Sequence, residues 1–255
     1  MSGARTIAGR WARGVTAAAA LLAACMAGHA APPRDAAATD APQVIFFGSS
    51  TTAGTGASRP ERRWTTLLAR HAGWSEVNEG LPGSTLTDVT GRPAPSGELR
   101  WRALAGSGLR PGVVVVMYGA NDAIAGVPLG EADAPGTFRH AAASVLRGLR
   151  AAFPRAVLVV CTPQPGRRLD RARRAPYDAA LADEARAVGA VVVRGDEAFA
   201  PDALPRFAAD TIHLNDAGHA ALAAYVERAL LDARVISRPH VAKGAGFGVD
   251  GAMMP

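Results

Sequence analysis

The chain has 255 residues, 49% of them hydrophobic, which is enough for one α/β domain with a substantial core. Lys and Arg outnumber Asp and Glu by 28 to 22, a net charge of +6. No aromatic side chains are interleaved with these bases and no nucleic-acid-binding motif is present, so we do not expect a nucleic-acid-binding protein.

The N-terminal segment has the pattern of an export signal. Met1–Arg13 carries three arginines and no acid, and the apolar stretch Val15–Ala24 follows it. That stretch is too short to span a membrane as a stable helix. We expect residues 1–30 to be a signal peptide and the mature protein to be periplasmic or extracellular. Without the three arginines the net charge is +3.

Two cleavage sites are open. Leu22-Ala-Ala-Cys25 resembles a bacterial lipobox, in which Cys25 would carry a lipid anchor and become the first mature residue. Alternatively, cleavage follows Gly28-His-Ala30. Residues 31–42, rich in Ala, Pro and Asp, are expected to form a disordered tether.

Apolar strands alternate with helical segments over residues 43–235, the expected folded domain. Strands are expected near 44–47, 75–79, 112–117, 156–161 and 190–194. Helices are expected near 61–72, 97–107, 136–152, 175–188 and 216–231. This alternation predicts a three-layer α/β/α sandwich around a central, mostly parallel five-stranded sheet.

Polar segments follow the first two strands. Gly48-Ser-Ser-Thr-Thr-Ala-Gly54 comes directly after Val44–Phe47 and offers a serine nucleophile, although alone it could be a polar turn. After the second strand, Gly80 and Gly83 lie in a short loop. A glycine there lets a backbone N–H approach a ligand closely, although the loop could also simply be flexible.

The third strand, Val113–Met117, is an apolar β-branched run typical of a strand buried on both faces. Asn121 and Asp122 follow it, where parallel sheets build sites. The Asn121 amide can donate to a developing oxyanion, although Gly, Asn and Asp are also ordinary turn residues. The segment 120–136 comes next and is expected to be a wall or lid of the substrate cleft.

Asp210-Thr-Ile-His213 precedes the last helix, for which Asn215 or Asp216 is the expected N-cap. A carboxylate that binds one ring nitrogen of a histidine leaves the other free to take a proton. A zinc site formed by Asp210, His213 and His219 is an alternative. Its spacing matches no zinc motif, so we expect no metal and interpret His219 as a helix residue packed near the site.

The motifs occur in the order Ser, Gly, Asn, Asp/His. In this order and over Val44–Leu231, the chain resembles the SGNH hydrolases, also called GDSL-type esterases and lipases. The resemblance implies a flavodoxin-like α/β/α fold. It also implies a catalytic triad of Ser50, Asp210 and His213, and an oxyanion hole formed by the backbone N–H of Ser50, the backbone N–H of Gly83 and the Asn121 side chain. Gly80 is the alternative to Gly83.

One position departs from the family pattern. The family Gly-Asp-Ser is Gly48-Ser49-Ser50 here, which puts in doubt the network that holds the nucleophile loop. Ser50 is the expected nucleophile because Thr52 and Gly54 then match the family pattern S-x-[ST]-x-G.

The resemblance implies an exported serine esterase or lipase that acts on a small ester, a lipid or an acylated carbohydrate and needs no cofactor. A carbohydrate O-acetylesterase or acyltransferase using the same site is an alternative. A non-catalytic ligand-binding protein on the same fold is another, supported only by Ser49.

Three further features of the sequence are a cysteine, the C-terminal tail and an arginine cluster. Cys161 ends an apolar run and is expected to be a buried free thiol. The Gly-rich composition of residues 238–255 predicts a disordered tail. We expect the protein to be a monomer. An arginine cluster is either a solvated loop and helix start or an anion-binding patch beside the site. Its members are Arg167, Arg168, Arg171, Arg173 and Arg174.

Overall fold

The computed structural model describes residues 41–168 and 171–237. The expected signal peptide with Cys25, nearly all of the tether and the Gly-rich tail lie outside these residues.

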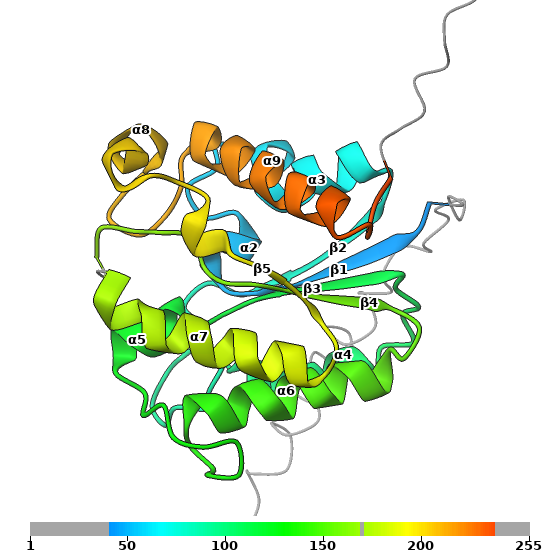
Figure 1. Ribbon diagram of the computed structural model, residues 1–255, viewed down its shortest axis with the longest axis vertical. Coiled ribbons are helices and arrows are strands. Elements are labelled where there is room, and N and C mark those ends of the chain that lie inside the picture. The colour runs from blue at the N-terminus through cyan, green and yellow to red at the C-terminus, as the bar shows by residue number, and fades with distance from the viewer. Residues whose placement is uncertain (1–40, 169–170, 238–255) are drawn as a thin grey trace, which may run out of the picture. The chain divides into compact units, whose positions relative to one another are not determined.

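Five strands form one sheet in the order β2-β1-β3-β4-β5 (Figure 1). The strands are β1 (Gln43–Gly48), β2 (Ser75–Gly80), β3 (Val113–Met117), β4 (Val157–Cys161) and β5 (Val191–Val193). All neighbouring strands are parallel, so the sheet is entirely rather than mostly parallel. Parallel neighbours need crossover connections, which the intervening helices provide.

Helices cover both faces of the sheet, as the three-layer prediction requires. The helices of the described residues are α2 (Ser50–Ala53), α3 (Trp64–Ala72), α4 (Gly97–Ala105), α5 (Ala120–Ala125), α6 (Phe138–Ala152), α7 (Arg171–Ala187), α8 (Leu204–Phe207) and α9 (Asp216–Asp232), with 3-10 turns at Pro60–Arg62, Gly195–Glu197 and Pro201–Ala203. In Figure 1, α3 and α9 lie on one face and α4, α6 and α7 on the other.

The alternation of side chains along β1 creates two cores. Val44 and Phe46 pack with Trp64 on the α3 and α9 side, whereas Ile45 and Phe47 pack on the α4, α6 and α7 side. Because helices cover both faces, the inner strands β3 and β4 are apolar throughout, as expected for a buried parallel sheet. The edge strand β2 is mostly polar and only partly buried. The predicted N-cap Asn215 is confirmed, since its side chain accepts the Gly218 N–H at 2.9 Å.

Helix α7 begins at Arg171, four residues before the predicted start, and includes Pro176. Arg174 and Asp178, one turn apart, form a buried ion pair that stabilises these first turns. The one-turn helices α2 and α8 and the six-residue α5 were not predicted. They are too short to show a helical period.

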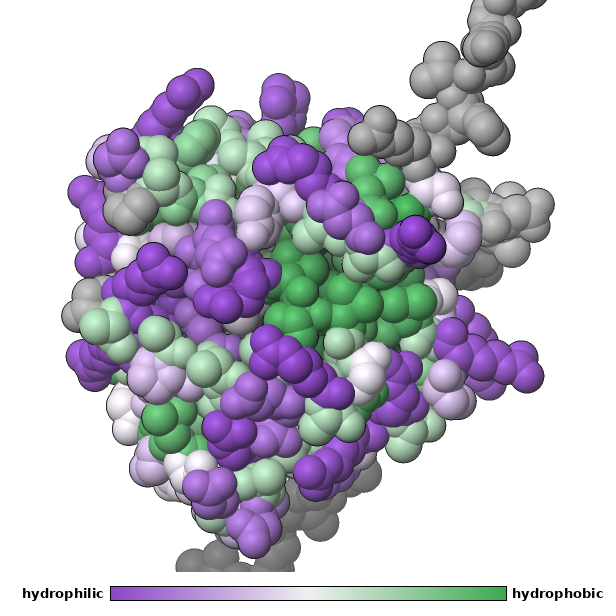
Figure 2. Space-filling view, in the orientation of Figure 1, coloured by the Kyte–Doolittle hydropathy of each residue, from purple (hydrophilic) through white to green (hydrophobic). Residues whose placement is uncertain are grey.

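The edge strand β5 is only partly covered. Figure 2 shows a hydrophobic area in its region, between α9 and α7 and bordered by hydrophilic side chains. Cys161 of the neighbouring β4 is a buried free thiol, as predicted, and burial raises its pKa. None of the helices within residues 41–168 and 171–237 is long and apolar enough to cross a membrane.

Candidate active site

The predicted motifs start side by side at one edge of the sheet. Gly48, the last residue of β1, is in register with Gly80 of β2 and Met117 of β3. The segments that leave these three strands therefore begin as neighbours. This is the carboxyl edge of the sheet, where open parallel sheets bind ligands.

Ser50 is the first residue of α2 and is 7% exposed. At that helix position its backbone N–H has no intrahelical acceptor. The preceding turn requires Gly48, because a Cβ there would collide with Thr52 Oγ1 and lie 2.6 Å from Met117 O. The Ser49 side chain does not cap α2, and it lines the pocket beside Ser50.

Asp210 and His213 lie on a loop closed by a backbone bridge between Ala208 and Leu214. The Asp210 carboxylate accepts the backbone N–H of Ile212 at 2.6 Å and of His213 at 2.7 Å. Its Oδ2 is 2.7 Å from His213 Nδ1, and His213 Nε2 is 3.0 Å from Ser50 Oγ. With the ring proton on Nδ1, the Nε2 lone pair faces the serine hydroxyl.

The charge of Asp210 is stabilised by these contacts. Burial would raise the pKa of Asp210, but hydrogen bonds from the His213 backbone, the His213 ring and the Ile212 N–H outweigh it and lower the pKa to about 2. The carboxylate is therefore ionised at neutral pH and can stabilise a histidine cation.

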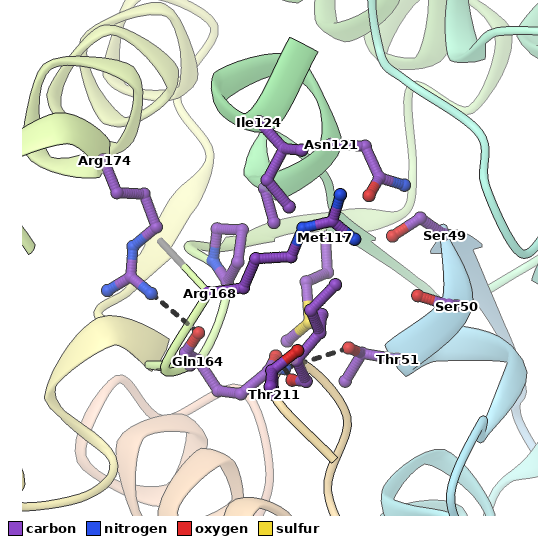
Figure 3. Close-up of a pocket in the computed structure, with 14 residues that line it drawn as sticks. Ser49, Ser50, Thr51, Met117, Asn121, Ile124, Gln164, Arg168, Arg174 and Thr211 are labelled. Carbon is purple, nitrogen blue, oxygen red and sulfur yellow. Dashed lines mark hydrogen bonds between the residues drawn. The ribbon is translucent and has the colours of Figure 1, made fainter. Parts of the chain in front are cut away.

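Asn121 is the second residue of α5, and its side chain faces the same pocket as Ser49 and Ser50 (Figure 3). Its Nδ2 donates one hydrogen to Ser84 O at 2.8 Å. The other amide hydrogen has no acceptor among the described residues and remains available to a ligand.

Of the two candidate glycines, Gly80 already uses its N–H, which donates to Asn78 Oδ1 at 2.9 Å. The Gly83 N–H has no acceptor in the part of the chain that the structure describes. Gly83 has φ +79°, a conformation that glycine adopts readily. The free donor is therefore on Gly83, next to the Ser84 carbonyl that holds Asn121.

Asp122 positions this loop, a role that the sequence analysis did not assign. It is fully buried, and its two carboxylate oxygens accept the N–H groups of Leu86 and Thr87, each at 2.9 Å. Burial raises the pKa of Asp122, although these hydrogen bonds oppose the shift. The sequence signal that could have indicated this role is its position directly after Asn121.

Arg100 of α4 ties the strand ends together beneath the site. It donates to Glu79 O at 2.7 Å and to Tyr118 Oη at 2.8 Å, and its guanidinium lies over the Phe47 ring. Tyr118 Oη is 3.4 Å from Ser84 Oγ. No local sequence signal indicates Arg100, because its partners lie in β1, in β2 and directly after β3.

Helix α2 is held by tertiary contacts rather than by an acid at position 49. Trp64 Nε1 donates to Thr51 O at 3.0 Å, and Asn78 Nδ2 donates to Thr52 O at 2.8 Å. On the other side, Gln164 Nε2 donates to Thr51 Oγ1 at 3.0 Å. These contacts answer the concern that Ser49 leaves the nucleophile loop without support.

His219 packs near the site, as predicted, and uses both ring nitrogens. Nδ1 accepts the Trp64 N–H and Nε2 donates to Thr55 O, both at 3.3 Å. Burial lowers the pKa of His219, which favours this neutral form. His219 could not join Asp210 and His213 on a zinc ion without breaking these bonds. Within the described residues no group of three or more His, Cys, Asp or Glu side chains is suited to hold a metal.

A small pocket, of about 30 Å³, opens beside the nucleophile. In Figure 3 Ile124 and Asn121 lie along one side of the pocket, Ser49 lies next to Asn121, and Ser50 and Thr51 follow Ser49 along the adjoining side. The segment after Asn121 thus contributes a wall through α5.

The arginine cluster does not act as one patch. Arg167, Arg171 and Arg173 are exposed, which fits a solvated segment. Arg174 is buried, so that interpretation is wrong for it, and Arg168 and Arg174 both line the pocket.

Comparison with known proteins agrees with this geometry. A family model described as the GDSL-like Lipase/Acylhydrolase family matches residues 46–221. No curated protein matches this chain in sequence.

Several solved structures share the fold. A protein from Lactobacillus plantarum has 23% identity and a TM-score of 0.62, over 76% of this chain and 98% of that chain. An inhibitor-bound aryl esterase from M. smegmatis has 16% identity and a TM-score of 0.60, over 77% and 100%. A salicylyl-acyltransferase from a tetracycline biosynthetic pathway has 18% identity and a TM-score of 0.62, over 78% and 56%.

Proposed function

The chain belongs to the GDSL-like lipase/acylhydrolase family, and on that premise we propose that it is a serine esterase that hydrolyses carboxylic esters. The observation that carries the proposal is the 3.0 Å contact between Ser50 Oγ and His213 Nε2, with His213 Nδ1 held by Asp210. Nucleophile, base and orienting acid are thus already in hydrogen-bonding positions.

In the first half-reaction Ser50 Oγ attacks the ester carbonyl carbon while His213 Nε2 takes the hydroxyl proton. The negative charge that develops on the carbonyl oxygen is stabilised by the N–H groups of Ser50 and Gly83 and by the free amide hydrogen of Asn121. Collapse of this intermediate breaks the bond to the alcohol oxygen, which receives the proton from His213. An acyl-enzyme on Ser50 remains.

In the second half-reaction His213 removes a proton from water as the water oxygen attacks the acyl carbon. Collapse returns the proton to Ser50 Oγ and releases the carboxylic acid. Asp210 stays ionised throughout, consistent with its lowered pKa. Every proton transfer in this cycle is assigned to a side chain of the protein or to water.

An O-acetylesterase or acyltransferase would use the same site, with a sugar ester as substrate or an alcohol in place of water. We also propose that the protein acts after export.

The test is hydrolysis of 4-nitrophenyl esters from acetyl to palmitoyl. Ser50→Ala and His213→Ala are expected to lower kcat by about 10³-fold or more, whereas Ser49→Ala should cost less than about tenfold. The acyl-chain profile separates an acetylesterase from a lipase. If the folded Ser50→Ala protein keeps full activity, the proposal is wrong. If the folded parent protein hydrolyses none of these esters, the result favours the alternative of a non-catalytic ligand-binding protein.

A further inference from the structure

The pocket beside Ser50 is positively charged. Among the residues that line it, the charged side chains are Arg168 and Arg174, and no acidic side chain lines it. The remaining walls are neutral, and Met117, Ile124 and Pro163 make part of them apolar.

The two arginines differ in their partners. Arg174 is 4% exposed, and its charge is balanced by Asp178, with 2.8 Å between Arg174 Nε and Asp178 Oδ2. Arg174 also donates to Gln164 O at 2.7 Å. Arg168 has no carboxylate within ion-pair distance in the described part of the chain. Among the described residues, therefore, a carboxylate balances the charge of Arg174 and none balances that of Arg168.

Arg168 is held where it can meet a substrate. Its backbone N–H donates to Thr211 O at 2.9 Å, which anchors it to the loop that carries His213. In Figure 3 its side chain extends across the pocket, with the guanidinium toward the wall formed by Ile124 and Asn121. An exposed arginine elsewhere on the surface would extend into solvent instead.

We propose that Arg168 is a specificity-determining residue that selects esters bearing a second, negatively charged group, a carboxylate or a phosphate. This inference rests on the proposed esterase function. The guanidinium forms paired hydrogen bonds with such groups. The negative group lies on either the acyl or the alcohol side of the ester. Pairs of charged and neutral esters distinguish these two positions.

Two pairs of substrates carry the test. For the acyl side, 4-nitrophenyl hydrogen glutarate is compared with 4-nitrophenyl valerate, which has the same number of acyl carbons and no charge. For the alcohol side, 4-acetoxybenzoate is compared with its methyl ester. Spontaneous hydrolysis is subtracted for each ester. The measured quantity is kcat/KM for the anionic ester divided by kcat/KM for its neutral partner.

Three variants are compared with the parent protein. Arg168→Gln removes the charge, Arg168→Lys keeps the charge without the planar fork, and Arg70→Gln removes an exposed charge from α3 as a matched control. In one of the two pairs Arg168→Gln should lower the ratio by about tenfold or more, the loss typical of a charge-assisted hydrogen bond. Arg168→Lys should lower it less, and Arg70→Gln should leave it unchanged.

Added salt should lower the ratio of the parent and leave that of Arg168→Gln nearly constant, because Arg168 is exposed to solvent ions. An unchanged ratio in both pairs after Arg168→Gln overturns the inference. Active hydrolysis of the neutral esters in that case would leave the esterase function intact. If the folded parent protein hydrolyses none of the four esters, both the inference about Arg168 and the proposed esterase function are contradicted.

Discussion

The Asn121 side chain donates to the backbone carbonyl of Ser84, with 2.8 Å between Nδ2 and O. Together with the bonds from Leu86 and Thr87 to Asp122, this bond joins the loop after β2 to the segment after β3. It also fixes the direction of the second amide hydrogen. The proposed oxyanion donors Gly83 and Asn121 are therefore positioned relative to each other. Both loops begin next to the turn that carries Ser50.

Replacing Asn121 tests the oxyanion hole. Asn121→Ala should lower kcat by about 10²–10³-fold with a small change in KM, because the lost hydrogen bond is strongest in the transition state. Asn121→Asp, of nearly the same size, should be at least as impaired, since it offers an acceptor where a donor is needed. Steady-state kinetics on 4-nitrophenyl acetate measure both. A rise in KM with unchanged kcat would contradict the assigned role.

Asp122→Asn should impair stability and activity together. The amide group would face one of the two backbone N–H groups that the carboxylate now accepts, leaving that N–H unsatisfied in a buried place. We expect the free energy of unfolding to fall by about 1–3 kcal/mol. The measurement is urea denaturation alongside kcat. Unchanged stability would show that the loop does not depend on the charge of Asp122.

The two glycines of the loop after β2 should respond differently to alanine. A Cβ at Gly80 would collide with the backbone nitrogen of Ala53 in α2, so Gly80→Ala should displace the nucleophile helix. A Cβ at Gly83 meets only Ala94, at 3.9 Å, so Gly83→Ala should cost mainly the backbone strain of its positive φ, about 1–2 kcal/mol. Gly80→Ala should thus lose more stability and more activity, by thermal unfolding and kcat/KM. The reverse order would contradict the assignment.

Asp178 should make stability depend on pH. Burial raises its pKa from 3.8 to about 6, although Arg174 opposes the shift. Between about pH 4 and 6 the folded protein keeps a proton on Asp178 that the unfolded chain has released. The free energy of unfolding therefore falls as pH rises through this window, by up to about 2–3 kcal/mol.

The matched variant is Asp178→Asn, which retains an oxygen acceptor for Arg174 but cannot titrate. Its stability relative to the parent should increase as pH rises from about 4 to 6 and stay constant above that. Urea denaturation across this range measures the difference. A difference independent of pH would show that Asp178 titrates at the same pH in both states.

The sequence was sufficient for most of the sheet because β1, β3, β4 and β5 are short apolar runs between polar turns, whereas the edge strand β2 is mostly polar. It was insufficient for α2 and α5, which have too few residues for a helical period. Helix α2 is held instead by Trp64 and Asn78, whose partners are distant in sequence.

The candidate site also contains residues that the sequence could predict and residues that it could not. Ser50, Asn121, Asp210 and His213 stand in recognisable motifs, and the structure brings them to one edge of the sheet. Arg100 could not be found in this way, because its bonds to Glu79 and Tyr118 exist only after three strands align. The pairing of Arg174 with Asp178, although not its burial, could have been anticipated from their spacing of four residues, which pairs charges along a helix.

The proposed nucleophile and its base are 163 positions apart, Ser50 after the first strand and His213 just before the last helix. A growing chain that has made β1 and α2 still lacks the base. Contacts this distant in sequence form late and only with the complete fold. The molecule should therefore be inactive until folding is finished, and its specific activity can serve as a measure of the fraction of correctly folded chains.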